Sequence, residues 1–250
     1  MDLEIYTLKA RPDLRPHVFS PAFRAPLWPE FMLHDPTALL YFSGPHFAEY
    51  LDYAFAVLQD GKIVGRAFSV PFAYGIEGRT DLPEGGWDQV IRWAHADQLA
   101  GRSPNAVSAL EISILPAARS AGNARLILQA MKANARRLGF SDLYAPVRPN
   151  EKHLVPSMPM QEYMALTRAD GLPRDAWLRT HVRAGGKIIK VAPYAMTIVG
   201  SITEWRRWTG QPFRASGSIA VPGALSLVTC SLEHDVAVYV EPGVWVHHSV

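Results

Sequence analysis

The sequence predicts a single-domain α+β (α/β) protein in which helices flank a mixed central sheet. Two β-rich runs, residues 53–59 and 62–72, flank Asp60-Gly61, which is a strong signal for a hairpin turn. Residues 105–150 then follow the pattern strand, tight turn, helix, strand. A length of 250 residues with 48% hydrophobic residues is enough to bury one sizeable core.

The first third of the chain contains strands and one long helix. Residues 3–8 alternate in polarity and predict the first strand, whereas residues 11–29 are rich in proline and predict short helices and loops. Gly65 lies inside the second hairpin strand, which indicates a bulge or a close backbone approach. Residues 85–102 have apolar side chains at helical spacing and predict a helix.

The central segment is the most regular. Residues 105–116 predict a strand with Leu110, Ile112 and Ile114 on one face and Ala109, Glu111 and Ser113 on the other. A helix follows, because apolar residues recur at helical spacing, and Gly139 suits its C-terminal cap. Its apolar stripe consists of Ala124, Ile127, Leu128, Met131, Ala135 and Leu138. Residues 141–150 predict the next strand.

After residue 150 the pattern is less regular. Residues 172–186 predict a helix closed by Gly185-Gly186, and residues 203–210 predict a short helix. Residues 187–193 and 195–202 predict two strands, and residues 221–248 predict strands and turns. No internal repeat or clear linker divides the chain.

Composition excludes several classes of function. A net charge of +2 gives no basic surface for nucleic acid, and no apolar run approaches the length of about 20 residues that a membrane span needs. A single cysteine, Cys230, excludes an internal disulfide and a multi-cysteine metal site, and we expect a cytoplasmic protein. The nine histidines show no metal-ligand spacing, so no metal is expected.

Residues 119–124, RSAGNA, form the turn between the central strand and its helix. The first N–H groups of a helix have no intrahelical acceptor and, with the helix dipole, they make an anion site. Gly122 allows a tight turn and close approach of a ligand, Ala124 keeps the first turn slim, and Arg119 adds a positive charge. Such a turn suits a pyrophosphate. The alternative is that Gly122 belongs to an ordinary turn and that Arg119 is a solvated surface charge.

This turn resembles the pyrophosphate loop, Arg/Gln-x-x-Gly-x-Gly/Ala, of the GNAT superfamily of acyl-CoA-dependent N-acyltransferases. The flanking strand, helix and strand ending at Asn150 resemble that family's fourth strand, third helix and fifth strand. The resemblance implies a mixed, mostly antiparallel central sheet with a long C-terminal elaboration. Residues 1–150 would form the acyl-CoA-binding core, and residues 151–250 would complete the sheet and shape the acceptor pocket.

The resemblance also implies a reaction and a cofactor site. An acyl group would move from acetyl-CoA or a related acyl-CoA to an amine by direct attack in a ternary complex. The acceptor would be a small-molecule or peptide amine, and a homodimer is left open. The expected cofactor-binding residues are Ile112, Ile114, Arg119, Ser120, Ala121, Gly122, Asn123, Ala124 and Asn150.

Two side chains are candidates for proton transfer. Glu111, in the central strand, is the candidate base, and its alternatives are a solvated sheet face or pairing with an arginine. Tyr163, thirteen residues after Asn150, is the candidate acid, and a packing role is its alternative, because two prolines interrupt the intervening segment.

Other residues and functions remain open at this point. His181 is a further candidate base, Cys230 a candidate nucleophile, and the cluster Trp205–Trp208 a candidate stacking surface, each with a structural role as the alternative. The alternative functions are a non-catalytic acyl-CoA-binding protein of the same fold and an acyltransferase that uses a carrier-protein thioester.

Overall fold

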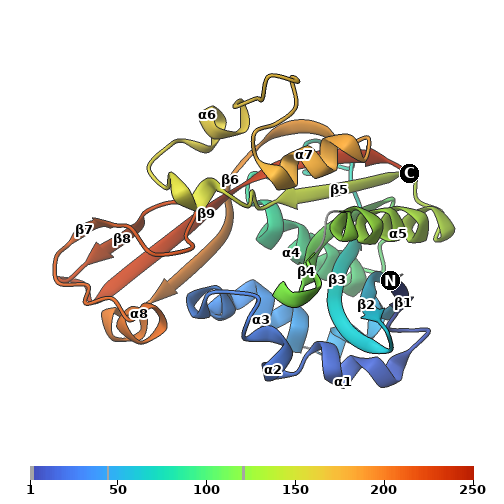
Figure 1. Ribbon diagram of the computed structural model, residues 1–250, viewed down its shortest axis with the longest axis horizontal. Coiled ribbons are helices and arrows are strands. Elements are labelled where there is room, and N and C mark those ends of the chain that lie inside the picture. The colour runs from blue at the N-terminus through green and yellow to red at the C-terminus, as the bar shows by residue number, and fades with distance from the viewer. Residues whose placement is uncertain (1–2, 44, 120–121) are drawn as a thin grey trace.

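The computed structural model describes residues 3–43, 45–119 and 122–250 and has one large sheet (Figure 1). Its strands follow the order β1-β2-β3-β4-β5-β9-β8-β7, and β6 pairs with β9. Among these pairs β4 and β5 run parallel and the others antiparallel, so the predicted mixed, mostly antiparallel sheet is confirmed. The strands are β1 (Glu4–Thr7), β2 (Ala54–Gln59), β3 (Lys62–Phe72), β4 (Ala106–Ile114), β5 (Asp142–Val147), β6 (Lys187–Gly200), β7 (Gly217–Ile219), β8 (Val228–Ser231) and β9 (Val236–Ser249).

Helices cover both faces of this sheet. The α-helices are α1 (Arg15–Val18), α2 (Pro21–Arg24), α3 (Pro36–Ser43), α4 (Gly86–Leu99), α5 (Asn123–Arg137), α6 (Met160–Met164), α7 (Ala176–Arg183) and α8 (Ile202–Thr209). The 3-10 helices are η1 (Pro12–Leu14), η2 (Glu30–His34), η3 (Pro45–Tyr53), η4 (Pro116–Ala118) and η5 (Lys152–Leu154). Among the described residues, no helix is both long and apolar enough to cross a bilayer.

The β2–β3 hairpin forms as its turn residues predict. Asp60 and Gly61 both have positive φ, 51° and 72°, as a type I′ turn requires. Both expectations for Gly65, a bulge and a close backbone approach, are confirmed. The register of β3 against β2 shifts beside it, and an added Cβ would lie 2.9 Å from the Ser113 carbonyl oxygen.

A bulge in β4 overturns the predicted alternation of its side chains. Glu111 pairs with Phe68 and Ala109 pairs with Ser69, so Leu110 is an extra residue on this strand. Leu110 therefore packs with the cluster under α4, whereas Ala109, Ile112 and Ile114 pack with the cluster under α5. A bulge bends its strand, and β4 pairs with β5 only at Val107–Leu143 and Ser108–Tyr144 before the two strands separate.

The C-terminal strands join the sheet through β9. The C-terminal half of β9 pairs with β5, and its N-terminal half pairs with β8, while β6 pairs along most of its length. The two strands expected at 187–193 and 195–202 form the single strand β6, with an irregular register between Ala192 and Met196. As Figure 1 shows, β6 and β9 extend away from the core and carry β7, β8 and α8 at their far end.

Candidate active site

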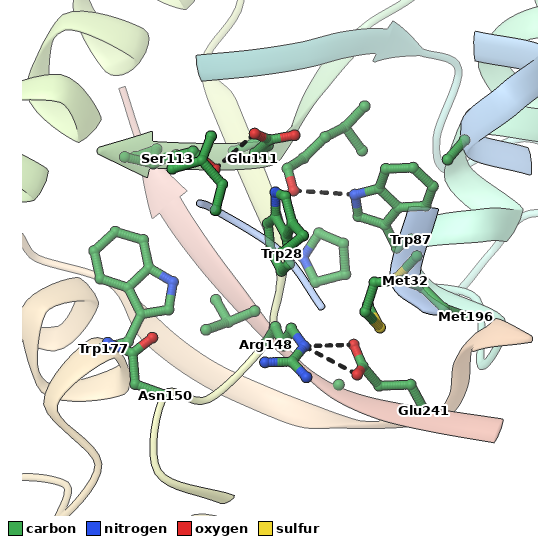
Figure 2. Close-up of a pocket in the computed structure, with 18 of the residues that line it drawn as sticks. Trp28, Met32, Trp87, Glu111, Ser113, Arg148, Asn150, Trp177, Met196 and Glu241 are labelled. Atoms are coloured by element: carbon green, nitrogen blue, oxygen red, sulfur yellow. Dashed lines mark hydrogen bonds and ion pairs between the residues drawn. The ribbon is translucent and has the colours of Figure 1, made fainter. Parts of the chain in front are cut away.

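A cavity of about 620 Å³ opens where β4 and β5 separate (Figure 2). One wall consists of β4 from Ala109 to Ile114, and another consists of β5 and the residues after it, from Ala145 to Arg148. The first turns of α5 contribute Ala124 and Leu128. The segment from Phe19 to Phe42, which ends within α3, closes the opposite side. The cavity therefore depends on the bulge that parts the two strands.

The side of the cavity toward α5 holds most of the predicted cofactor residues. Ile112, Ile114, Arg119, Ala124 and Asn150 all line the cavity. Beyond Ser108 no β5 residue pairs with β4, so this edge of β4 turns backbone groups toward the cavity. Ser120 and Ala121, also expected here, lie outside the described residues.

The start of α5 has the geometry of an anion site. Gly122 is the N-cap residue with φ of +109°, and the space around it is open, because an added Cβ would meet no atom of the described residues within 4 Å. The first turn of α5 contains no acidic residue. The neighbouring side chains fasten the turn: Asn123 Nδ2 donates to the Ala118 carbonyl at 2.9 Å, and Arg119 Nε donates to the Ile114 carbonyl at 3.1 Å. Backbone N–H groups at such a helix start attract phosphate.

Glu111 is held by Arg66 on the neighbouring strand. Arg66 Nε lies 2.7 Å from one carboxylate oxygen and Nη2 lies 3.3 Å from the other, while Ser113 Oγ donates to the first at 2.6 Å. Both side chains are buried, with exposed fractions of 4% and 7%. Because both carboxylate oxygens already accept hydrogen bonds, the geometry favours the arginine-paired alternative over a base.

The opposite side of the cavity combines aromatic and charged side chains, as Figure 2 shows. Trp28 and Trp87 line it, and Trp87 Nε1 donates to the carbonyl of the bulge residue Leu110 at 3.0 Å. Trp177 lies beside Asn150 on the side toward α5 (Figure 2). Arg148 donates from Nε to both oxygens of Glu241, at 3.0 and 2.9 Å, and lies 5.8 Å from the ring centre of Trp28. This pair joins the end of β5 to β9.

Sequence reasoning did not single out Arg148 or Glu241. A signal was present, because Glu241 interrupts the apolar strand VAVYVEPGVWV, and a carboxylate in such a strand is seldom buried without a cation. The partner, 93 residues away, could not be read from local sequence.

Comparison with known proteins decides the family. No family model matches the sequence. Arginine N-acetyltransferase avaD of Aspergillus versicolor is 32% identical over 274 residues, covering 98% of this chain and 93% of that relative. The chain belongs to the GNAT superfamily. It is therefore an acyl-CoA-dependent N-acyltransferase that transfers an acyl group to an amine, as the resemblance implied.

Two solved structures have the same fold as this GNAT chain. The loading GNATL domain of CurA from Lyngbya majuscula superposes with a TM-score of 0.60 at 19% identity, covering 99% of this chain and 96% of the other. A GphF GNAT-like decarboxylase in complex with isobutyryl-CoA superposes with a TM-score of 0.57 at 18% identity, covering 100% and 99%. At these identities the likeness concerns the fold.

Tyr163 does not reach the cavity of this GNAT protein. Its hydroxyl donates to Asp175 Oδ2 at 2.9 Å, and the ring is buried in the cluster beneath α5. Burial raises the pKa of this hydroxyl well above its ordinary value, with the Asp175 charge as a second cause. The short helix α6, which follows Pro159, directs the side chain to Asp175, so Tyr163 is corrected from acid to packing residue.

The remaining candidates also have structural roles in this GNAT fold. His181 lines the cavity but is buried, its Nδ1 lies 2.9 Å from His248 Nε2, and burial together with His248 lowers its pKa to about 3. A ring with so low a pKa is a weak base. Cys230, Trp205 and Trp208 are buried in the cluster at the far end of β6 and β9, away from the cavity.

The GNAT cavity carries excess positive charge. Arg66 and Arg148 are balanced by Glu111 and Glu241. The Arg24 guanidinium also lines the cavity, and among the described residues it has no ion-pair or hydrogen-bond partner, although its Nε is buried. A cavity with an unbalanced cation attracts an anionic cosubstrate such as CoA. Within the described ranges no cluster of three or more metal-ligating side chains occurs.

A buried carboxyl pair lies between the segment that closes the cavity and α4. Asp35 precedes α3 and Asp88 lies in α4; one Asp35 oxygen accepts from Ala38 N, and one Asp88 oxygen accepts from Thr197 N. The other oxygens, Asp35 Oδ2 and Asp88 Oδ1, have no donor among the described residues. Burial raises the pKa of Asp35 to about 6, and burial and the Asp35 charge raise that of Asp88 to about 8. The pair therefore holds a proton at neutral pH.

This pair makes stability depend on pH. Because the folded pKa values lie above the unfolded value near 3.9, the folded chain binds more protons between about pH 4 and 8, and stability falls as pH rises through this window. Asp88→Asn cannot ionise, so we expect the free energy of unfolding to exceed that of the unmodified chain by about 1–2 kcal/mol at pH 9. Urea unfolding at pH 6 and pH 9 measures this difference.

Asp81→Asn is the matched control. Asp81 is exposed and paired with Lys190, which lowers its pKa, so it is ionised at both pH values and its removal should leave the change between them unaltered. Equal pH dependence in Asp88→Asn and the unmodified chain would contradict the role of the pair.

Proposed function

We propose that this chain transfers an acetyl group from acetyl-CoA to a nitrogen of an arginine-type acceptor, with both substrates bound in the cavity at once. The supporting observation is that one cavity joins the start of α5 to the aromatic and charged wall around Trp28 and Arg148. A thioester on one side and a nitrogen on the other can then meet without a covalent enzyme intermediate.

For the cofactor, we propose that the pantetheine arm lies along β4 from Ile112 to Ile114. Backbone groups there would bind its amides, and an N–H of this strand would stabilise the oxyanion of the tetrahedral intermediate. The diphosphate would bind the N–H groups at the start of α5, with Arg119 beside it. Support comes from the separation of β4 from β5 and from the open approach to Gly122.

For the acceptor, the arginine specificity follows the relative, which is named an arginine N-acetyltransferase. The cavity lining supports this arginine specificity, because Trp28 and Trp177 line the cavity and a planar guanidinium binds well against an indole ring. Arg148 already lies against Trp28 in this way.

The experiment is a turnover assay that follows release of the CoA thiol with acetyl-CoA and a panel of acceptors. The panel contains arginine, agmatine, an arginine-containing dipeptide, and lysine and ornithine as amines without a guanidinium. We expect guanidinium-bearing acceptors to be preferred, with intersecting initial-velocity lines, as direct attack in a ternary complex requires.

The alternatives give different results. Tight CoA binding without thiol release on any acceptor would indicate a non-catalytic acyl-CoA-binding protein. Transfer only from an acylated carrier protein would indicate a carrier-dependent enzyme, and parallel lines would indicate a covalent intermediate.

A further inference from the structure

The cavity has several ionisable groups, but most of their proton-accepting atoms are already occupied. Glu111 accepts from Arg66 and Ser113, and Glu241 accepts from Arg148 and Tyr239. His181 also lines the cavity, and its Nδ1 lies 2.9 Å from His248 Nε2, but burial lowers its pKa to about 3 and makes it a weak base. His153 is different, and it lines the same cavity, beside Asn150.

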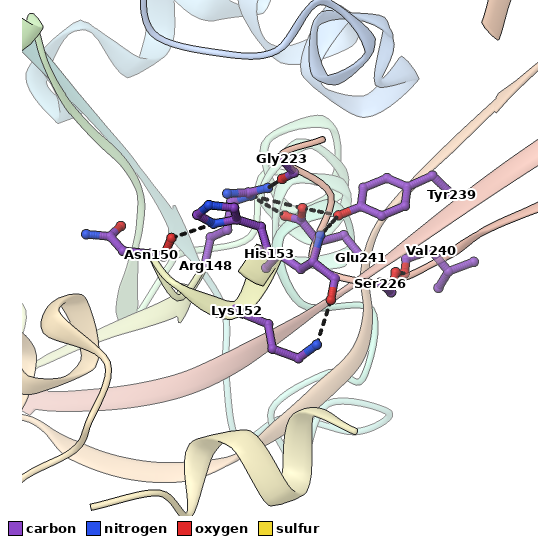
Figure 3. Close-up of polar contacts among 10 residues, drawn as sticks. Arg148, Asn150, Lys152, His153, Gly223, Ser226, Tyr239, Val240 and Glu241 are labelled. Carbon is purple, nitrogen blue, oxygen red and sulfur yellow. Dashed lines mark hydrogen bonds and ion pairs between the residues drawn. The ribbon is translucent and has the colours of Figure 1, made fainter. Parts of the chain in front are cut away.

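One hydrogen bond fixes the tautomer of His153 (Figure 3). Its Nδ1 lies 2.9 Å from the backbone carbonyl oxygen of Asn150. A carbonyl can only accept, so Nδ1 must donate and carries the hydrogen of the neutral ring. Nε2 then has the lone pair, and within the described part of the chain it has no hydrogen-bond partner.

The segment that presents His153 is firmly anchored. The preceding residue, Lys152, is 1% exposed, and its ammonium donates to the carbonyls of Val155, Pro156 and Leu225 at 2.9, 3.3 and 2.7 Å. The last of these carbonyls belongs to the loop before β8, so η5 is tied to a distant part of the chain. A ring on an anchored segment is held in one place relative to the cavity.

The charged groups that surround this segment have hydrogen-bond partners other than the His153 ring. Lys152 points to its three carbonyls, and Glu241 of β9 is neutralised by Arg148. Asp175, the N-cap residue of α7, accepts from Tyr163, from Glu151 N and from the first N–H groups of α7. Glu151 itself is exposed.

We propose that His153 is the catalytic residue that moves the proton in acyl transfer. The acceptor nitrogen attacks the thioester carbonyl and forms the C–N bond, and its proton passes to His153 Nε2. The C–S bond then breaks, its electron pair leaves on sulfur, and the imidazolium returns the proton to the thiolate. The products are the amide and CoA thiol, and the ring ends neutral. The proposal rests on the proposed acyltransferase function.

The test replaces His153 by glutamine and measures kcat/KM against pH. General base catalysis contributes about 100-fold to 10,000-fold, so we expect a loss of about 100-fold or more. In the unmodified enzyme, log kcat/KM should rise more steeply with pH at the acidic end of the profile, where the catalytic group and the acceptor must both lose a proton, than at higher pH. In His153→Gln this steeper region should be lost.

Two further variants make the result decisive. His153→Ala should regain activity with added imidazole, a readout that a merely structural role would not give. His234→Gln, an exposed histidine outside the cavity lining, should keep the unmodified profile. Thermal unfolding and CoA affinity of His153→Gln should be unchanged.

The outcomes separate this proposal from the function on which it depends. If the unmodified chain transfers acyl groups and His153→Gln keeps its rate and its pH profile, His153 is not the proton carrier, although the function stands. If the unmodified chain transfers no acyl group to any amine, the proposed function fails first.

Discussion

Replacing Gly122 by aspartate is expected to weaken CoA binding by about 100-fold, which corresponds to about 2.7 kcal/mol. Gly122 has φ of +109°, and a residue with a Cβ is strained there by roughly 1–2 kcal/mol. The aspartate would also place a negative charge at the helix start, where the diphosphate is proposed to bind. Isothermal titration calorimetry with CoA measures the loss.

Gly139→Asp is the matched control for this variant. Gly139 follows the other end of α5, has φ of +90°, is exposed and has the same open surroundings. It therefore imposes the same strain and the same charge on the fold, far from the proposed diphosphate. Gly139→Asp should bind CoA like the unmodified chain, and equal losses in both variants would show a general effect on folding instead of a phosphate site.

Replacing Glu111 by alanine is expected to lower the free energy of unfolding by about 3–5 kcal/mol. The substitution leaves the Arg66 guanidinium in the sheet interior with an exposed fraction of 4% and no carboxylate beside it. Its remaining partner would be the Val18 carbonyl, 2.9 Å from Nη1. Urea unfolding at pH 7 measures the change.

A second variant separates the charge from the packing. Arg66→Met combined with Glu111→Leu removes both charges and keeps side-chain volume, so we expect it to recover most of the stability that Glu111→Ala loses. Asp13→Ala, which breaks the exposed pair with Arg11, should leave the urea unfolding midpoint unchanged, because solvent screens an exposed pair. Stability of Glu111→Ala within 1 kcal/mol of the unmodified chain would refute the structural role of Glu111.

Features with local causes were predictable from the sequence. Asp60-Gly61 specifies its own turn, and the apolar stripe of α5 depends only on residue spacing within the helix. The cofactor side of the cavity follows from these elements, because Ile112, Ile114 and Ala124 lie on the strand and helix that the pattern predicts.

Features that need a distant partner were not predictable. The bulge at Leu110 exists only in the register of β4 against β3, and it changes which face Ala109 and Leu110 occupy. Glu111 could be given a role only once Arg66, 45 residues away, was placed beside it. The tautomer of His153 likewise depends on a backbone carbonyl whose orientation no side-chain pattern encodes.

The most direct test of the account is a crystal structure of the protein with CoA and arginine. We expect the pantetheine arm to lie between the separated ends of β4 and β5, the diphosphate at the start of α5, and the acceptor against Trp28 with a nitrogen facing both the thiol and His153. CoA bound elsewhere, or a diphosphate that makes no contact with the N–H groups of residues 122–124, would contradict it.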